Sequence, residues 1–450
     1  MKNLWLFSLI LAISGTKAHA DDADTLSLPL REAIHRALTS SIQTRKARWE
    51  RHAAALQIAE QRRGALTPKV EALANADYVP ALPTTFLPAT LFGGQEGAYV
   101  SSTLGQPWQL FASVRVEQPL FDEAARRLAP ASALSQSLQD ALVELSEEEI
   151  IFQTTQLFYQ VLQARASLRA LDAHLEQFEA LERMVRLRVE NDQAVQTDVQ
   201  RIQVTIAHLQ ARRHELEGGI EALRQGLQFL CGIPLEQPVA LADLSNPSDS
   251  IGQSVSAPLA IERTTTHRLL EGRLSLLRIQ EHSMRARGWP KLGLYAQAGV
   301  LSQRADVRFA ASNGRWYPLG LVGLRLEWPL LEGYRRRPGA ERLRLEIQRN
   351  EEERNDYARA RQMELLQAST QRNNALHALR ARKQAVALAR EVVSQLQLAY
   401  RNGVTPLSDL LAAQTALAEA ETQYEQQVFT CRLAEVKWLR AAGLLRTLLE

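Results

Sequence analysis

Residues 379–410, LRARKQAVALAREVVSQLQLAYRNGVTPLSDL, carry two helical signals in one stretch. Leu379, Val386, Val393 and Tyr400 are each seven residues apart, and no glycine or proline interrupts them. Apolar residues at every seventh position form one stripe along a helix, which a second helix covers in a coiled coil. The first half of the stretch therefore predicts a long helix that packs sideways against others.

The second half of the stretch predicts a sharp turn into another helix. Asn402-Gly403 suits a left-handed helix end, Thr405 an N-cap and Pro406 the first helical position. Asp409 then falls in the first turn of the outgoing helix, where the helix dipole favours a carboxylate.

A related turn occurs 211 residues earlier, because residues 191–198 match residues 402–409. Asp198 takes the acidic position in this first copy. However, Asp192 stands where the glycine would be, and no proline follows. We therefore expect the first turn to be looser than the second.

Segments without glycine or proline extend the helical pattern over much of the chain, at residues 131–217, 340–402 and 407–442. Glycine costs about 1 kcal/mol and proline about 3 kcal/mol inside a helix, so these segments can be helical over great length. An apolar stripe with steps of three and four, broken only at Glu182, runs through the first of them. Its members are Val161, Ala164, Leu168, Leu171, Leu175, Phe178, Val185 and Val189.

Four shorter segments, residues 70–78, 108–116, 292–300 and 322–328, alternate apolar and polar residues as β-strands do. Strands of about ten residues can cross a bilayer when tilted. Aromatic residues gather around them: Tyr78, Phe86, Phe92, Tyr99, Trp108, Phe111, Tyr295, Phe309, Trp316, Tyr317 and Trp328. The aromatics indicate either a girdle at a membrane surface or packing in a small soluble sheet. Four strands cannot close a membrane barrel, so the first interpretation requires several chains.

The first twenty residues are interpreted as a secretory signal peptide, with Lys2, an apolar segment from Leu4 to Ile13, and a small-x-small site at Ala18-His19-Ala20. Beyond it, no apolar run reaches the about 18 residues of a transmembrane helix, which leaves a soluble exported protein or one that spans a membrane as strands. The chain has 53 Lys and Arg against 50 Asp and Glu, and no run of five like charges. We therefore expect no nucleic-acid partner.

The two halves of the chain repeat each other. Residues 115–120, RVEQPL, match residues 325–330, RLEWPL, and each half predicts a helix, a β-hairpin and a helical hairpin in that order. We assign residues 1–20 to the signal peptide, 21–232 to the first repeat, 233–266 to a linker and 267–450 to the second repeat.

Four motifs carry a family resemblance: LPLREAI at 28–34, EQPLFD at 117–122, EWPLLEG at 327–333 and YRNGVTPLSDL at 400–410. In this order and spacing they resemble the TolC family of outer-membrane efflux proteins. The resemblance implies a mixed α and β fold, predominantly α. In it, long antiparallel coiled-coil hairpins form a periplasmic tunnel, and each chain contributes four strands to a trimeric twelve-stranded transmembrane barrel.

The resemblance also implies a function. Members are passive exit ducts in the cell outer membrane that span the periplasm and contact outer-membrane lipid. They work as homotrimers with a periplasmic adaptor and an inner-membrane pump, without a cofactor, in drug efflux, metal efflux or type I secretion. The alternative is a non-channel periplasmic coiled-coil adaptor or structural spacer. An adaptor usually has one helical hairpin, whereas this chain predicts two with a strand pair in each half.

The resemblance further implies a gate at the tips of the helical hairpins. Asp409 matches an acidic gate residue, Tyr400 a gate tyrosine, and Thr197 with Asp198 the facing helix. A trimer would place six carboxylates around one opening, which raises the local cation concentration. Helix capping alone also accounts for both aspartates.

Two positions depart from the family pattern, since Thr405 replaces an arginine and Ala412 a second aspartate. These departures argue against a strong salt-bridge lock. The family's adaptors are thought to dock at the same tips, here Asn402, Gly403, Val404, Thr405, Pro406 and Leu407. An ordinary solvated turn is the other interpretation.

No motif predicts catalysis or a metal site, because HExxH and GxSxG are absent and Gly218-Gly219 is interpreted as a local bend that interrupts a helix. We therefore expect no enzyme activity. If the halves stack in parallel, Cys231 corresponds to position 442, eleven residues or about 16 Å beyond Cys431. A disulfide needs Cα atoms within about 7 Å, so the sequence predicts two free, buried thiols.

Overall fold

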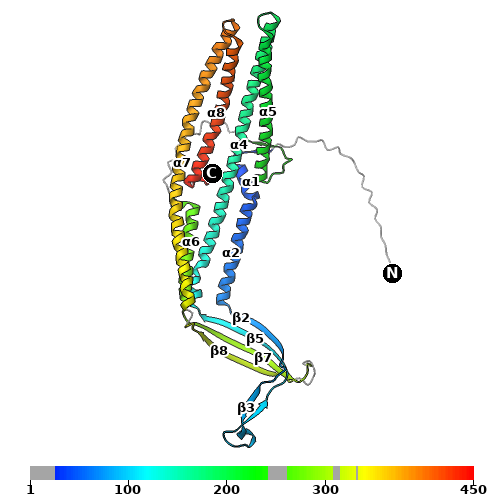
Figure 1. The fold of residues 1–450 in the computed structure, drawn as a ribbon, viewed down its shortest axis with the longest axis vertical. Helices are drawn as coiled ribbons and strands as arrows, with labels where there is room; N and C mark the ends of the chain where they lie inside the picture. Colours follow the sequence, from blue (N-terminus) through cyan, green and yellow to red (C-terminus); the bar gives the residue numbers. More distant parts are fainter. Residues whose placement is uncertain (1–25, 242–260, 308–314, 331–332, 450) are drawn as a thin grey trace, which may run out of the picture. The chain divides into compact units, whose positions relative to one another are not determined.

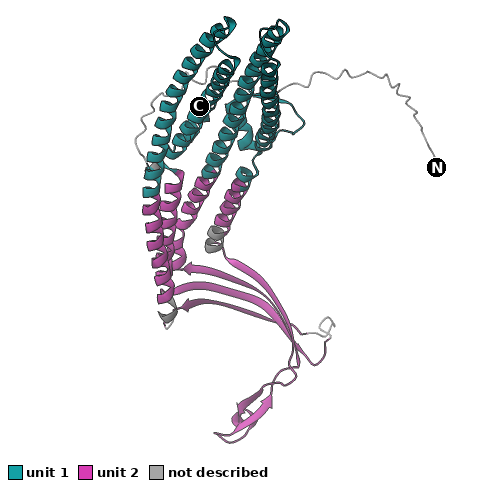
Figure 2. Cartoon of the chain, turned by 45° about the horizontal axis from the view of Figure 1, so that its top comes forward, with its two compact units in different colours: residues 1–46, 144–264, 358–450 teal, residues 47–143, 265–357 magenta. Residues whose placement is uncertain are grey.

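A computed structural model of the chain describes residues 26–241, 261–307, 315–330 and 333–449 (Figure 1). The predicted signal peptide, residues 1–20, and residues 242–260 of the predicted linker lie outside the described residues. Two compact units are present, each built from both halves of the sequence (Figure 2). Unit 1 comprises residues 1–46, 144–264 and 358–450, and unit 2 comprises residues 47–143 and 265–357.

Four long helices are present, α4 (Pro130–Glu190), α5 (Gln196–Cys231), α7 (Gly333–Arg401) and α8 (Leu407–Ala442), and the two predicted apolar stripes lie on α4 and α7. The chain turns back between α4 and α5 and between α7 and α8, as predicted (Figure 1). No apolar residue of either stripe is exposed, and Val161 and Val185 are fully buried. The stripes are therefore the packing faces of the helices. Of the described helices, none is both long and apolar enough to cross a membrane.

The predicted interruption at Gly218-Gly219 is wrong. Helix α5 continues through both glycines without a break. A Cβ atom at either position would meet no atom within 4 Å, so no close approach requires glycine there. The cost of about 1 kcal/mol for each glycine is small beside the burial of apolar residues along the rest of α5.

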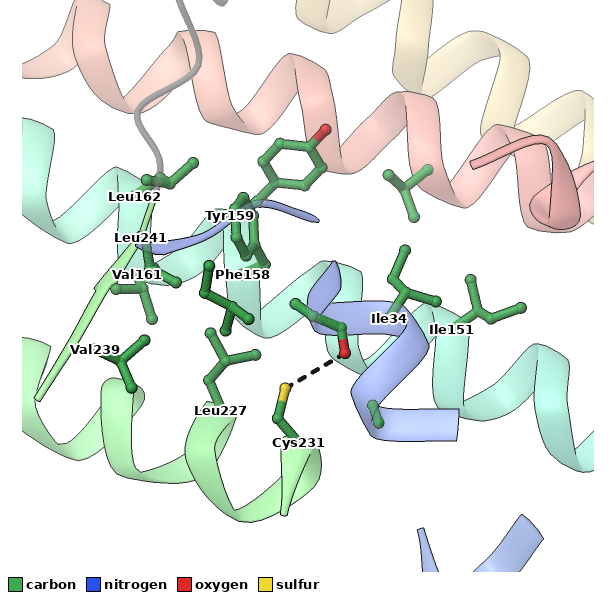
Figure 3. Close-up of a cluster of buried hydrophobic side chains, with 14 of the residues drawn as sticks. Ile34, Ile151, Phe158, Tyr159, Val161, Leu162, Leu227, Cys231, Val239 and Leu241 are labelled. Atoms are coloured by element: carbon green, nitrogen blue, oxygen red, sulfur yellow. Dashed lines mark hydrogen bonds between the residues drawn. The ribbon is translucent and has the colours of Figure 1, made fainter. Parts of the chain in front are cut away.

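The main core of unit 1 gathers residues from both ends of the chain (Figure 3). Helix α1 (Leu30–Ser40) supplies Ile34, α4 supplies Phe158 and α5 supplies Leu227, all at most 1% exposed. Strands β1 (Leu26–Leu28) and β6 (Val239–Leu241) pair in parallel beside this core. The helix η3 (Leu445–Leu449) adds the buried Leu445 from the other end of the chain.

Unit 2 contains an antiparallel sheet in the order β2-β5-β7-β8. Its strands are β2 (Lys69–Tyr78), β5 (Trp108–Phe121), β7 (Lys291–Arg304) and β8 (Tyr317–Glu327), which confirms the four predicted strands. In the described part of the chain, β2 and β8 each have one neighbour, so the sheet has two open edges.

All four strands join helices at the same end of the sheet. Helix α2 (Ile42–Leu66) leads into β2, and α6 (Thr265–Ala286) leads into β7. Helix α3 (Glu123–Leu128) follows β5, while α7 follows β8. The antiparallel register, which places Lys69 opposite Glu117 and Lys291 opposite Glu327, brings these junctions together.

A further hairpin between β2 and β5 was not predicted. It consists of β3 (Thr84–Pro88) and β4 (Tyr99–Thr103), joined by the short helix η1 (Ala89–Phe92). These two strands pair with each other and form no ladder with the four-stranded sheet. Five residues are too few for an alternating pattern to stand out in the sequence.

Candidate functional site

The two helical turns of unit 1 share the backbone hydrogen bond that closes the turn. The amide of Gln193 donates to the Arg188 carbonyl at 2.8 Å, and the amide of Val404 donates to the Ala399 carbonyl at 2.9 Å. One residue earlier in each turn, Asp192 and Gly403 are both left-handed, with φ of 56° and 70°. Both turns are thus the same left-handed helix end.

The expected looseness of the first turn is therefore not seen, since the aspartate adopts the conformation that the glycine adopts in the second. Aspartate is among the few residues that tolerate this region, because its short polar side chain can bond locally. The N-cap assignment of Thr405 is also corrected. Helix α8 begins after Pro406 without a side-chain cap, and the buried Thr405 hydroxyl has no hydrogen-bond partner in the described chain.

The predicted gate aspartates occupy equivalent places. The Asp198 amide bonds to the Val195 carbonyl at 2.9 Å, and the Asp409 amide bonds to the Pro406 carbonyl at 3.3 Å. Neither carboxylate forms a cap hydrogen bond with its helix among the described residues.

The surroundings of the two carboxylates differ. Asp198 is half-buried and lies 3.8 Å from an Arg201 guanidinium nitrogen. Asp409 is exposed and, within the described residues, accepts only from the Ser408 hydroxyl at 3.3 Å. Thr197, beside Asp198, is exposed. Asp409 is thus the less neutralised of the two charges.

Tyr400 is buried at 6% exposure within the apolar cluster beneath the turns. The cluster contains Phe178, Leu181, Val185, Val199, Ile202, Ile206, Tyr400, Leu407 and Leu410 from all four long helices. In the single chain, the Tyr400 ring therefore lies inside the helix packing and faces no open surface.

Arg188, which the sequence analysis missed, joins the two helical hairpins. From the end of α4, its guanidinium donates to the carbonyls of Tyr400 at 3.0 Å and Arg401 at 2.7 Å, and it lies 4.7 Å from the Tyr400 ring centroid. A cation at the last carbonyls of a helix complements the helix dipole. The available signal was a basic residue in the last turn of α4, but its partner on α7 lies more than 200 residues away.

The predicted docking tip is exposed only in part. Asn402, Gly403 and Pro406 are exposed, and Val404 is the most exposed apolar side chain of the tip at 76%. Leu407 is instead 3% exposed and belongs to the apolar cluster.

The sheet of unit 2 exposes its apolar face. Alternate residues of β8 on this face, Val322, Leu324 and Leu326, are 65–76% exposed, and Val70 of β2 is 62% exposed. On the opposite face, Ser113 is 6% exposed. This is the reverse of a sheet that packs its apolar face into a water-soluble core.

Aromatic side chains mark both ends of the sheet. The rings of Tyr78 and Trp108 lie 4.8 Å apart at one end, where Tyr317 is also exposed. Trp289 and Trp328 are exposed at the helix-bearing end. Tyrosine and tryptophan favour such positions at the two surfaces of a membrane.

Both cysteines are free and buried, as predicted. The Cys231 thiol contacts the Ala33 carbonyl at 3.4 Å, and the Cys431 thiol contacts the Ala375 carbonyl at 3.2 Å (Figure 3 shows the first). Burial raises the pKa of Cys231 to about 12 and raises the pKa of Cys431 as well. Both thiols are therefore neutral at ordinary pH and poor nucleophiles.

Residues 270–432 match the model of a family described as Outer membrane efflux protein. The resemblance to this family is confirmed. The proteases secretion protein PrtF of Dickeya chrysanthemi is 23% identical over 97% of this chain and 89% of its own length. Among solved structures, the outer-membrane channel OprN superposes with a TM-score of 0.75 at 18% identity, over 92% of this chain and 89% of that one.

The outer membrane channel MtrE of Neisseria gonorrhoeae, solved in its open state, superposes with a TM-score of 0.69 at 17% identity, over 92% of this chain and 88% of that one. Residues 270–432 thus share the sequence pattern of the outer membrane efflux proteins, and the chain shares its fold with the OprN and MtrE channels. A match to a channel family agrees with the prediction that the chain is not an enzyme.

Proposed function

We propose that this protein is a passive exit duct of the outer membrane, built from three copies of the chain and spanning the periplasm. The exposed apolar face of the sheet, bounded by aromatic residues at both strand ends, carries this proposal. Exposure of such an apolar face to water is unfavourable, whereas in a bilayer the face can contact lipid directly. Strands of 10 to 14 residues also suit the thickness of a bilayer.

The open edges of the sheet support the requirement for several copies. Backbone groups at an unpaired edge cannot remain unsatisfied in lipid, so β2 and β8 need partners. Pairing β8 of one copy with β2 of the next is a head-to-tail contact, which closes into a ring. Three copies would supply the twelve strands of the expected barrel.

The gate belongs to the helical turns in this proposal. Asp409 and Asp198 would stand near the periplasmic mouth and attract cations. Arg188 would hold the ends of α4 and α7 together while the mouth is closed, with Tyr400 packed beneath it. The exposed Val404 and its neighbours would contact the adaptor, and Leu407 would act only by supporting the turn.

Similarity to PrtF favours polypeptide secretion as one candidate use of the duct. The name of that relative describes secretion of proteases, and the similarity extends over nearly the whole chain. An inner-membrane pump and an adaptor would then select the cargo. The alternative of a periplasmic spacer gives no reason for an exposed apolar sheet face, so it is the weaker candidate.

Single-channel conductance of the purified full-length protein in a planar bilayer tests the duct. We expect a conductance that prefers cations, and we expect Asp198→Ala/Asp409→Ala to weaken that preference. Unchanged preference would keep the duct and leave the two aspartates as helix-dipole partners only. No conductance from protein shown to be folded and inserted would favour the spacer.

A further inference from the structure

A polar cluster on the sheet brings together three side chains from β5, β7 and β8. Glu117 lies directly opposite Tyr295 in the register of β5 and β7. The Arg325 guanidinium of β8 lies 5.0 Å from the Tyr295 ring centroid and 3.8 Å from a Glu117 carboxylate oxygen. Arg325 therefore reaches across β7, over the tyrosine ring, to a strand that is not its neighbour.

A glycine makes room for this arrangement. Gly323 is paired with Tyr295, and a Cβ atom there would lie 2.8 Å from the tyrosine hydroxyl oxygen and 2.9 Å from two ring atoms. The ring thus lies against the backbone of β8. Gly293, paired with Arg325, has no side chain to obstruct the arginine. Tyr295 and Arg325 are consequently laid along the sheet and do not project from it.

An unpaired cation lies next to this cluster. Arg115 donates to the Gln297 side-chain oxygen at 3.3 Å, and Gln297 donates to the Ser113 hydroxyl at 2.9 Å. Lys69 is paired with Glu71, and Arg325 with Glu117. Among the described residues, Arg115 has no carboxylate partner, Lys291 pairs with Asp122, and Glu327 at the same end of the sheet has no cation partner, so the charges of this band balance.

We propose that this polar band sets the width of the duct where the sheet meets the helices. Tyr295, held against Gly323, lies along the sheet and so keeps the passage wide. The proposal rests on the proposed function, because only a duct turns the polar face of the sheet toward an aqueous interior.

Gly323→Ala tests the width. The new methyl group displaces the far end of the Tyr295 side chain, which can move into the passage at little cost to the fold. We expect a lower single-channel conductance than wild type. Gly320→Ala is the matched control on the same strand, because its Cβ would approach nothing closer than the Gln297 carbonyl oxygen at 4.0 Å.

A double variant separates the ring from other effects of the new methyl. Tyr295→Ala/Gly323→Ala has no ring to displace, so it should conduct at least as well as wild type. An unchanged conductance in Gly323→Ala would overturn the role of the ring, as would a reduction that persists in the double variant.

A wild-type protein that conducts while the variants behave as wild type refutes the band alone, and a wild-type protein that never conducts refutes the duct itself.

Discussion

The turn between α4 and α5 and the turn between α7 and α8 have one backbone and two different sets of side chains. Asp192 and Gly403 occupy the same left-handed position, and the helix after each turn begins without a side-chain cap. Only the first turn provides Arg188, whose counterpart in the second is Ala399. The two turns therefore share a backbone conformation but differ in their side-chain contacts. Arg188 of the first turn donates hydrogen bonds, and the carbonyls at the start of the second turn accept them.

Substitutions in the apolar cluster beneath the turns should give the largest losses of stability, and these losses should differ between the two turns. Leu410 and Val199 occupy equivalent places and are 0% and 2% exposed. Leu410→Ala should destabilise the hairpin ends by about 2–5 kcal/mol, and Val199→Ala by less because fewer methyl groups are lost. Hydrogen exchange of the amides around each turn measures both. Equal, wild-type exchange in the two variants would contradict the packing described.

Removal of the Arg188 side chain should give the second largest loss of stability. Arg188→Ala loses two charge-assisted hydrogen bonds at a half-buried site, for roughly 1–3 kcal/mol. Amides near residues 399–404 should exchange faster while those near 191–198 change less. Arg186→Ala is the control, because Arg186 lies two residues earlier and, in the described part of the chain, pairs only with Glu182 of its own helix. Similar effects of both substitutions would remove the special role of Arg188.

Substitution of the left-handed residues should change the free energy of unfolding by a smaller amount. Gly403→Ala forces a Cβ into a left-handed conformation and should cost about 1–2 kcal/mol. Asp192→Gly removes that conflict but frees the unfolded chain, so its net effect should be smaller. Urea unfolding midpoints of the two variants in detergent give the comparison. A cost for Asp192→Gly that matched that for Gly403→Ala would show that the turns are not equivalent.

The smallest effect on stability is expected at the ends of the two repeats. There, Cys231 of the first repeat corresponds to Ala442 of the second, which has no titratable group. The folded-state pKa of Cys231 is about 12, raised by burial above its ordinary value of 9.0. The neutral thiol stabilises the fold fully below pH 9, and this stability is lost as pH rises from 9 toward 12. Between pH 9 and pH 10 the loss should be about 1 kcal/mol. Cys231→Ala should unfold with a weaker pH dependence than wild type, and equal dependence would argue against a buried thiol.

Much of the fold could be predicted because its signals are local. The heptads around Val386 and the alternation around Val114 each repeat within one element. The observed β5 extends five residues past the predicted strand, and α7 begins seven residues before the predicted helix. Gly218 and Gly219 misled the analysis because packing along α5 outweighs their intrinsic cost.

The candidate site was harder to predict because its contacts join distant segments. Arg188 could be seen as a helix-ending cation, but nothing near it in the sequence names Tyr400 as its partner. Arg325 reaching Glu117 over Tyr295 likewise depends on the order of strands and on the space left by glycines. Thr405 failed as an N-cap because one-residue boundaries are beyond what sequence patterns determine.

The open edges of β2 and β8 also bear on how the protein must be made. If the chain assembles from several copies as proposed, a newly made chain carries two unpaired strand edges and an exposed apolar sheet face until it meets the others. Such a chain is prone to pair edge to edge with the wrong neighbour, at a rate that rises with its concentration. The step before assembly is therefore the one at which this protein is most exposed to aggregation.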